Sequence, residues 1–485
     1  MTEKDAVAQG RLAGAKAASY LRAVNEPEAR ASAFTAPIML KTDLAYLMCS
    51  AEMKLMPEDT AKHLAAAVLA CLDELPSRDT TQPPGDIVGQ REKWVTQLVD
   101  KKDAAWLHLA RNRGESLRNY IPRLFFRDVL HMQGQEIAKL VQNLVSRAET
   151  LLDALAPNYH HLQHSGLATV GEYLLSWAVT FERHVLRLQQ VLERLDKGPS
   201  TFGGRTQTNE LFDKVSARLG FANRARLRRD GIWVQDQFTE PFFVLALIAV
   251  DLARLAQDLR IWMTPEFAMF DLADEHAGGS SGLPHAKVPF GLQQVVGAGV
   301  MASTRLAGEM ASACAGPSEG SEALYTSNTL YQNALDVTAN TTYMAEVVEK
   351  GGFRREEMAR KALLDYAGTS EAHDRLVYDF GVPFRLGHRI LGAMVRAHYY
   401  GEPLPDLNAV LRSETGRSFN IDQAEIMDIV LGKIIWPTTI DALGLQRIWQ
   451  DMNGKAKAAT KAFAGDSAVK RALDKVVQDA RAFAG

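Results

Sequence analysis

Apolar residues recur at helical spacing through the middle of the chain. Three- and four-residue steps connect them between residues 137 and 152, and again between 173 and 195. Each segment therefore predicts a helix with one apolar face. The segment 242–263 is apolar nearly all round in its first half, which predicts a helix covered by neighbours on every side. Further helices are expected at 291–313 and 333–349.

Alternating patterns of the kind that predicts strands are scarce, so the expected class is all-α. Several of the helices exceed the usual length of about 11 residues. Long apolar helices in mid-chain are typical of a large bundle shared between subunits. We expect three helical domains: 1–115 at the N-terminus, 116–365 as a central bundle of long helices, and 366–485 at the C-terminus.

Composition narrows the class of protein. The 485 residues carry a formal net charge of −3 and are 47% hydrophobic, which argues against a nucleic-acid binder. Three widely separated cysteines form no disulfide framework. The longest apolar run, 242–250, is shorter than the roughly 20 residues that cross a bilayer. The N-terminus lacks the apolar core of a secretory signal. These features favour a cytoplasmic protein with no membrane or nucleic-acid partner.

Three stretches could carry chemistry. The loop 278–289 (GGSSGLPHAKVP) has paired serines among glycines, and is either a closing loop over a substrate or a plain linker. The stretch 159–164 (YHHLQH) precedes an amphipathic helix. Its histidines are either acid–base catalysts, residues that bond backbone carbonyls at a helix start, or metal ligands, since His160 and His164 would share one helical face. The stretch 107–115 (LHLARNRGE) is either a carboxylate-binding turn or a solvated one.

Read together, these stretches resemble the signature regions of the argininosuccinate lyase branch of the aspartase/fumarase superfamily. The family patterns are LHTGRSRND, YTHLQ and GSSxMPxKKNP. Flanking segments extend the resemblance: residues 252–267 are similar to LSRLAEDLILWSSPEF, residues 381–388 to GVPFREAH, and residues 86–95 fall on DVHMAIERRL. The resemblance covers roughly residues 40 to 395.

The resemblance implies three helical domains, a homotetramer, and active sites that collect their three regions from different subunits. It also implies a β-elimination without cofactor or metal. Ser280 falls on the family's catalytic base, and His161 on a histidine linked to acid–base work. The implied substrate-binding residues, partly matched to the family and partly substitutes for it, are Arg111, Asn112, Arg113, His160, Gln163, Ser281, His285, Lys287 and Tyr325.

Departures from the family pattern are concentrated in these regions. The family's loop lysine falls on Ala286 and its loop asparagine on Val288, so a cation that compensates the substrate's charge is missing. His160, His285 and Lys287 are candidate replacements. We therefore expect a lyase that splits a C–N bond in a substrate other than argininosuccinate. Two alternatives are an inactive binding or scaffold protein, and a relative that adds an amine to a related acid.

Overall fold

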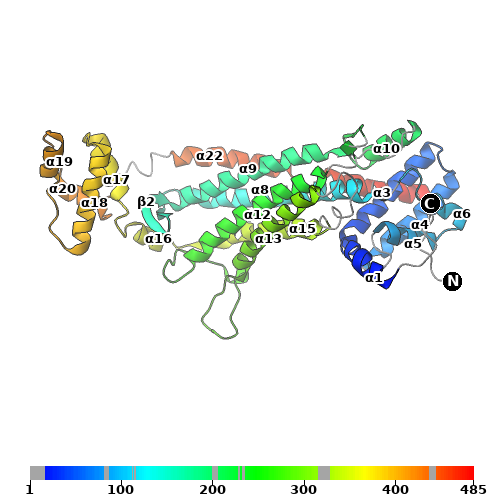
Figure 1. Ribbon diagram of the computed structural model, residues 1–485, viewed down its shortest axis with the longest axis horizontal. Helices are drawn as coiled ribbons and strands as arrows, with labels where there is room; N and C mark the ends of the chain where they lie inside the picture. Colours follow the sequence, from blue (N-terminus) through cyan, green and yellow to red (C-terminus); the bar gives the residue numbers. More distant parts are fainter. Residues whose placement is uncertain are drawn as a thin grey trace.

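The computed structural model describes residues 17–80, 87–111, 113, 116–198, 206–227, 230–231, 235–314, 328–435 and 444–485. The molecule is elongated, with a helical region at each end of a long central bundle (Figure 1). The five long helices of the bundle are α8 (Ile121–Glu149), α9 (Val170–Leu195), α12 (Asp236–Trp262), α13 (Phe290–Ala313) and α15 (Leu330–Lys350). Each overlaps one of the segments predicted to be helical, and the predicted segments 137–152 and 242–263 extend past their helices by three residues and one residue. The all-α class is confirmed.

The helices of the bundle are held by a continuous apolar core. Phe181, Leu252 and Met344 are fully buried and come from α9, α12 and α15. Their spacing on each helix places one apolar stripe toward the bundle axis. Outward-facing apolar side chains remain on α12 and α13, however: Phe243, Val250, Val300, Met301 and Met310 are between 36% and 60% exposed. Such a surface is typical of a face that another chain covers.

The N-terminal region has its own core. It is built from α3 (Ser32–Glu52), α4 (Glu58–Glu74), α5 (Ile87–Thr96), α6 (Lys101–Ala104) and α10 (Thr206–Arg218), preceded by the short α1 (Ala18–Tyr20) and α2 (Glu26–Ala29). Leu40, Leu64 and Phe212 meet in this core, although they are far apart in the sequence. The proline-rich segment 81–86 lies outside the described residues.

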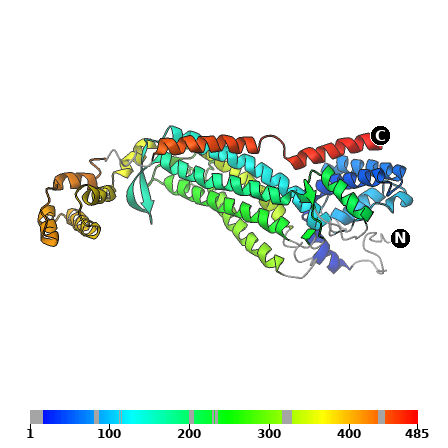
Figure 2. The same ribbon diagram turned by 90° about the horizontal axis from the view of Figure 1, so that it is seen from above.

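A third, smaller core lies at the opposite end of the molecule (Figure 2). Its helices are α17 (Thr369–Asp374), α18 (Phe384–Tyr400), α19 (Leu407–Thr415) and α20 (Gln423–Val430), and α16 (Arg355–Ala362) leads to it from the bundle. Leu376, Met394 and Ile426 are fully buried there.

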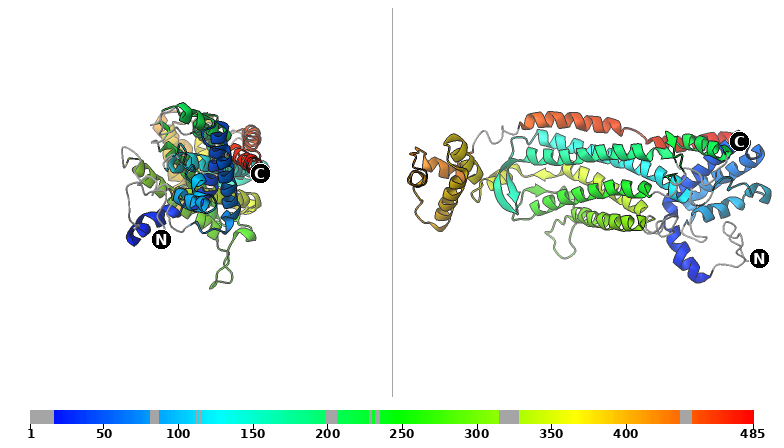
Figure 3. Two further views of the ribbon diagram at one scale, coloured as in Figure 1. Left: turned by 90° about the vertical axis from the view of Figure 1, so that its right-hand side faces the viewer. Right: turned by 45° about the horizontal axis from the view of Figure 1, so that its top comes forward.

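The last two helices leave this third core and run back along the molecule. α22 (Leu445–Ala462) packs against α8 and α9, and α23 (Ala468–Ala484) packs against α3 and α4 (Figure 3). Residues 445–485 thus share cores with the bundle and the N-terminal region, whereas the expected division placed all of 366–485 in one domain. The domain limits at about residues 115 and 365 stay a prediction.

The described strands are short pairs. The longest pair is an antiparallel hairpin of β1 (Leu155–His160) and β2 (Gln163–Thr169), with Leu155 opposite Thr169 and His160 opposite Gln163. The others are β3 (Lys197–Gly198) with β4 (Asn223–Arg224), and β5 (Phe270–Asp271) with β6 (Gly352–Phe353). In the part of the chain that the structure describes, no helix is long and apolar enough to cross a membrane.

Candidate active site

The histidine-rich stretch forms the tip of the hairpin, so the helix-start alternative among its three interpretations is wrong. β1 and β2 are joined by a two-residue turn, His161 and Leu162, whose φ angles are 52° and 58°. A two-residue hairpin turn with both φ values positive matches the twist of its strands, but normally uses Gly or Asn. His160, His161 and Leu162 are exposed. A strained and exposed turn at a candidate catalytic histidine is consistent with a functional site.

His164 is held within its own chain. Its Nδ1 lies 2.9 Å from the carbonyl oxygen of Leu364, and its Nε2 lies 3.0 Å from the hydroxyl of Tyr159. Because a carbonyl can only accept, Nδ1 donates the hydrogen bond to Leu364. His160 lies in β1 and His164 in β2. The two histidines therefore do not share a helical face, and the metal interpretation rested on such a face.

The glycine- and serine-rich loop extends from the side of the bundle between α12 and α13 (Figure 1). Two backbone hydrogen bonds of 2.8 Å between Gly278 and Val288 close it at its base. Within it, the Ser280 hydroxyl oxygen accepts hydrogen bonds from the backbone N–H groups of Leu283 at 3.1 Å and Gly282 at 3.4 Å. Donors on this oxygen favour its negatively charged form, so the turn suits a serine that acts as a base.

Other polar groups of the loop point elsewhere. Ser281 and His285 are exposed. Lys287 forms ion pairs with Asp274 at 2.7 Å and Asp271 at 3.2 Å. The hydrogen bond with Asp274, followed by the contacts with Asp271, raises the pKa of Lys287 above its usual value, so the lysine stays charged but is engaged by its own chain.

The two arginines of the first stretch have different surroundings. Arg111 is buried, pairs with Asp43 at 2.6 Å and stacks on Tyr46 with its guanidinium carbon 4.1 Å from the ring centre. Arg113 has a side chain 47% exposed and pairs with Glu28 at 2.8 Å. Arg111 thus supports the N-terminal core, and only Arg113 is accessible to a ligand. Asn112 lies outside the described residues, as does Tyr325.

The candidate residues do not meet within one chain. Arg113 precedes the first residue of α8, and the hairpin follows its last. Since α8 has 29 residues, these two regions are about 43 Å apart along its axis. The loop with Ser280 lies at the hairpin end, because α12 ends and α13 begins there (Figure 1).

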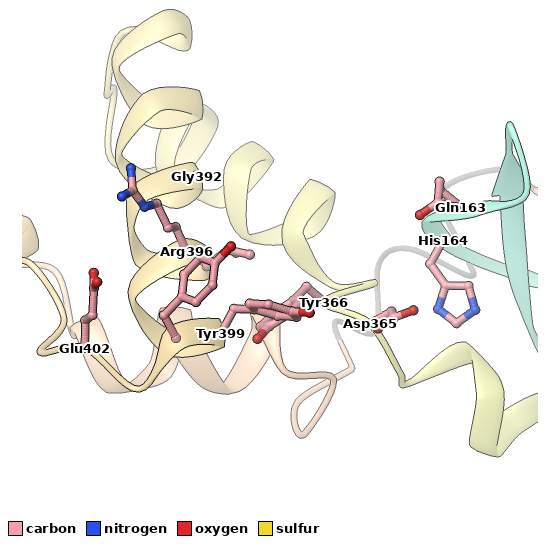
Figure 4. A pocket seen from close by; sticks show the side chains of 10 residues that line it. Gln163, His164, Asp365, Tyr366, Gly392, Arg396, Tyr399 and Glu402 are labelled. Atoms are coloured by element: carbon pink, nitrogen blue, oxygen red, sulfur yellow. The ribbon is translucent and has the colours of Figure 1, made fainter.

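Two hollows flank the hairpin. One, of about 720 Å³, opens between the hairpin and α18; Figure 4 shows Gln163 and His164 on one side and Arg396, Tyr399 and Glu402 on the other. The second, of about 480 Å³, lies under the hairpin and is lined by His161, together with Glu172, Tyr173 and Asp258. Sequence reasoning did not select these last three residues.

Comparisons with known proteins agree with this architecture. Residues 98–303 match the family model described as "Lyase". The argininosuccinate lyase of Methanocorpusculum labreanum is 25% identical over 397 residues, which are 81% of this chain and 80% of that protein. The crystal structure of EDDS lyase in complex with formate has a TM-score of 0.78 and 21% identity, and covers 99% of this chain and 98% of that one. An EDDS lyase variant with bound fumarate has a TM-score of 0.70 and 20% identity, and covers 99% of both chains.

Residues 98–303, less than half of the chain, carry the match to the lyase family model, and the chain as a whole shares its fold with EDDS lyase. In sequence, the chain is distantly similar to the argininosuccinate lyases.

Proposed function

We propose that the protein is a cofactor-independent carbon–nitrogen lyase. It eliminates an amine from an N-substituted aspartate or related succinyl compound, and the other product is fumarate or a related unsaturated acid. The observation that carries the proposal is the pair of backbone N–H groups on the Ser280 oxygen. The EDDS lyase structures hold formate or fumarate, both carboxylates, which supports an acidic substrate here. Ala286 and Val288, at the family's lysine and asparagine, argue against argininosuccinate itself.

The reaction begins at the carbon next to the retained carboxylate. The Ser280 hydroxyl first releases its proton to solvent water. The resulting alkoxide takes a proton from this carbon, and the electron pair of the broken C–H bond moves onto the carboxylate. That pair then forms the carbon–carbon double bond while the C–N bond breaks. The nitrogen leaves with the electrons of the C–N bond and takes a proton from His161. The N–H groups of Gly282 and Leu283 stabilise the charged serine oxygen, as donors in an oxyanion hole do.

Cationic and polar groups hold the acid. Arg113 is the arginine best placed to bind a carboxylate, because its side chain is exposed, whereas Arg111 is buried against Asp43. A guanidinium binds a carboxylate through two parallel hydrogen bonds. We propose that His160, Gln163, Ser281, His285 and Lys287 supply further contacts, and that Lys287 exchanges its exposed ion pairs for the substrate. Asn112 and Tyr325 complete the proposed set.

We propose that the protein is a homotetramer with shared active sites, and the length of α8 supports the sharing. Arg113 cannot reach the His161 or Ser280 of its own chain across about 43 Å, but an antiparallel neighbour places the two ends side by side. The exposed Phe243, Val250, Val300, Met301 and Met310 on α12 and α13 offer the apolar surface for such a neighbour.

The mechanism is tested by supplying a panel of N-substituted aspartates and following the ultraviolet absorbance of fumarate. For any compound that turns over, Ser280→Ala is expected to lower kcat by about 10²–10⁴-fold, the usual contribution of a positioned base. Ser281→Ala is the matched control on the same loop, and should cost much less. Unchanged turnover in Ser280→Ala would remove the mechanism.

The shared site is tested by mixing two inactive variants. Arg113→Ala and Ser280→Ala are each expected to be inactive as pure proteins. In a tetramer formed from both, some sites combine an intact arginine from one chain with an intact serine from another, so part of the activity should return. Each variant mixed with itself is the control. No recovery in confirmed mixed tetramers would mean that Arg113 and Ser280 do not act in one shared site.

A second candidate is a carboxylate-binding protein without turnover. Ala286 at the family's lysine, together with the engagement of Lys287 by Asp271 and Asp274, favours it. This candidate predicts that fumarate raises the melting temperature in proportion to the logarithm of its concentration, while the whole substrate panel stays uncleaved.

A further inference from the structure

The cavity under the hairpin has acidic and aromatic walls and lies within one chain. Its volume is about 480 Å³, large enough for a small organic molecule. Two carboxylates line it, Glu172 from the first turn of α9 and Asp258 near the end of α12. Four aromatic side chains surround them: Tyr159, Tyr173, Trp262 and Phe267.

The aromatic walls form two paired groups. The rings of Tyr173 and Trp262 are 4.5 Å apart between centroids, and those of Tyr159 and Phe267 are 5.5 Å apart. Trp262 is only 9% exposed, so its position is fixed by packing. Aromatic faces attract cations, and more strongly where water is excluded.

Neither carboxylate has a cationic partner among the described residues. Glu172 takes part in a capping box, in which the Thr169 hydroxyl accepts from the Glu172 N–H at 3.0 Å and the Thr169 backbone N–H donates to the Glu172 carboxylate. Asp258 accepts from the Tyr173 hydroxyl at 3.1 Å. Burial raises the pKa of both carboxyl groups, which is the expected state of acids that lack a counter-charge.

The basic side chains near the cavity do not supply this counter-charge. His161 is the one basic side chain among the described residues that line the cavity. Arg254 lowers the pKa of Asp258 through its charge, but it pairs with Asp251 at 3.0 Å and lies over Trp177, and it is not a lining residue.

We infer that this cavity binds an organic ammonium ion with an apolar body. The ammonium group would lie between the Glu172 and Asp258 carboxylates, and the apolar body would contact the Tyr159–Phe267 and Tyr173–Trp262 pairs. Such an ion has two sources: the amine half of the proposed substrate, since His161 lines the same cavity, or a separate amine ligand. The binding itself does not depend on turnover, so it can hold even if the proposed elimination fails.

The experiment is calorimetric titration of the full-length protein with benzylammonium chloride at neutral pH. Saturable binding is expected, and benzyl alcohol, which has the same shape without the charge, should bind at least tenfold more weakly. Glu172→Gln and Asp258→Asn should each weaken binding roughly tenfold or more, because each removes a charge-assisted contact. Glu193→Gln, on the same helix but outside the cavity, is the matched control and should bind as the wild type does.

Repeating the titration with saturating fumarate separates the two sources. A dissociation constant that changes with fumarate identifies the amine half of the substrate, and an unchanged constant identifies a separate ligand. The inference is overturned if binding is absent, if benzyl alcohol binds equally well, or if both carboxylate variants bind like Glu193→Gln. If one variant fails to fold, the other variant and the comparison with benzyl alcohol still test the inference.

Discussion

Arg111 and Asp43 form an ion pair of 2.6 Å inside the N-terminal core, with side chains 3% and 0% exposed. The same carboxylate lies 3.3 Å from the guanidinium of Arg91, which is 1% exposed. A single buried carboxylate thus serves two buried arginines. Removing one partner from such a cluster leaves a charge in a medium that solvates it poorly.

Asp43→Asn should therefore destabilise the protein by about 3–5 kcal/mol. Denaturant unfolding at neutral pH measures the change. Asp153→Asn is the control, because its ion pair with Arg355 lies on the surface, where both side chains are more than half exposed; its unfolding free energy should stay close to that of the wild type. A small effect of Asp43→Asn would mean that water or rearrangement replaces the lost charge.

The turn of the hairpin should carry conformational strain. Leu162 has a φ of 58° and is 62% exposed, so its side chain contributes little packing to offset a left-handed conformation that costs roughly 1–2 kcal/mol. Leu162→Gly is expected to stabilise the protein by about 0.5–1 kcal/mol, measured by thermal unfolding. Leu186→Gly, at an exposed leucine within α9, should do the reverse. Destabilisation by Leu162→Gly would show that the leucine is covered in the assembled protein.

Asp258 should make stability depend on pH. Burial raises the pKa of its carboxyl above the unfolded value, so its favourable contribution is complete at pH values below the unfolded pKa and is lost as the pH rises through the folded pKa. Asp258→Asn does not ionise, and its amide oxygen can still accept from Tyr173. The stability of the variant relative to the wild type should therefore increase as the pH rises above the unfolded pKa of about 3.9. Melting temperatures measured on both sides of this pH test the prediction, and a constant difference would contradict it.

The three cysteines should differ sharply in reactivity. Burial raises the pKa of the Cys49 and Cys71 thiols to about 11, whereas Cys314 is exposed. Since the thiolate is the reactive form, a thiol reagent at pH 8 should modify one cysteine per native chain and all three after denaturation. Cys314→Ser should abolish the native reaction. Rapid labelling of two or more native thiols would show that the N-terminal core opens readily.

The bundle could be predicted because its helices are long and strongly periodic. The expected segment 173–195 corresponds to α9 (Val170–Leu195), and 291–313 to α13 (Phe290–Ala313). In such helices the buried positions are apolar at every three- or four-residue step, so the pattern in the sequence matches the face that packs in the core.

The hairpin could not be predicted in the same way. Its strands contain Pro157 and Gly166, lack a clear alternation, and meet at His161 and Leu162 without the Asn or Gly that marks a two-residue turn. The packing of β1 against the bundle end, where Tyr159 contacts Phe267, holds the hairpin in a conformation that the local sequence does not favour. The buried role of Arg111 was equally hidden, because its partner Asp43 lies on a distant helix.

The return of α23 to the N-terminal core has a consequence for biosynthesis. Val469, Leu473, Val476 and Ala480 lie in the same apolar cluster as Leu40 and Leu64, and Lys41 pairs with Asp474 at 3.1 Å. The N-terminal core thus lacks part of its interior until α23 has been translated. The nascent chain exposes that apolar surface until α23 emerges, so holdase chaperones should bind it early and release it only after α23 has packed.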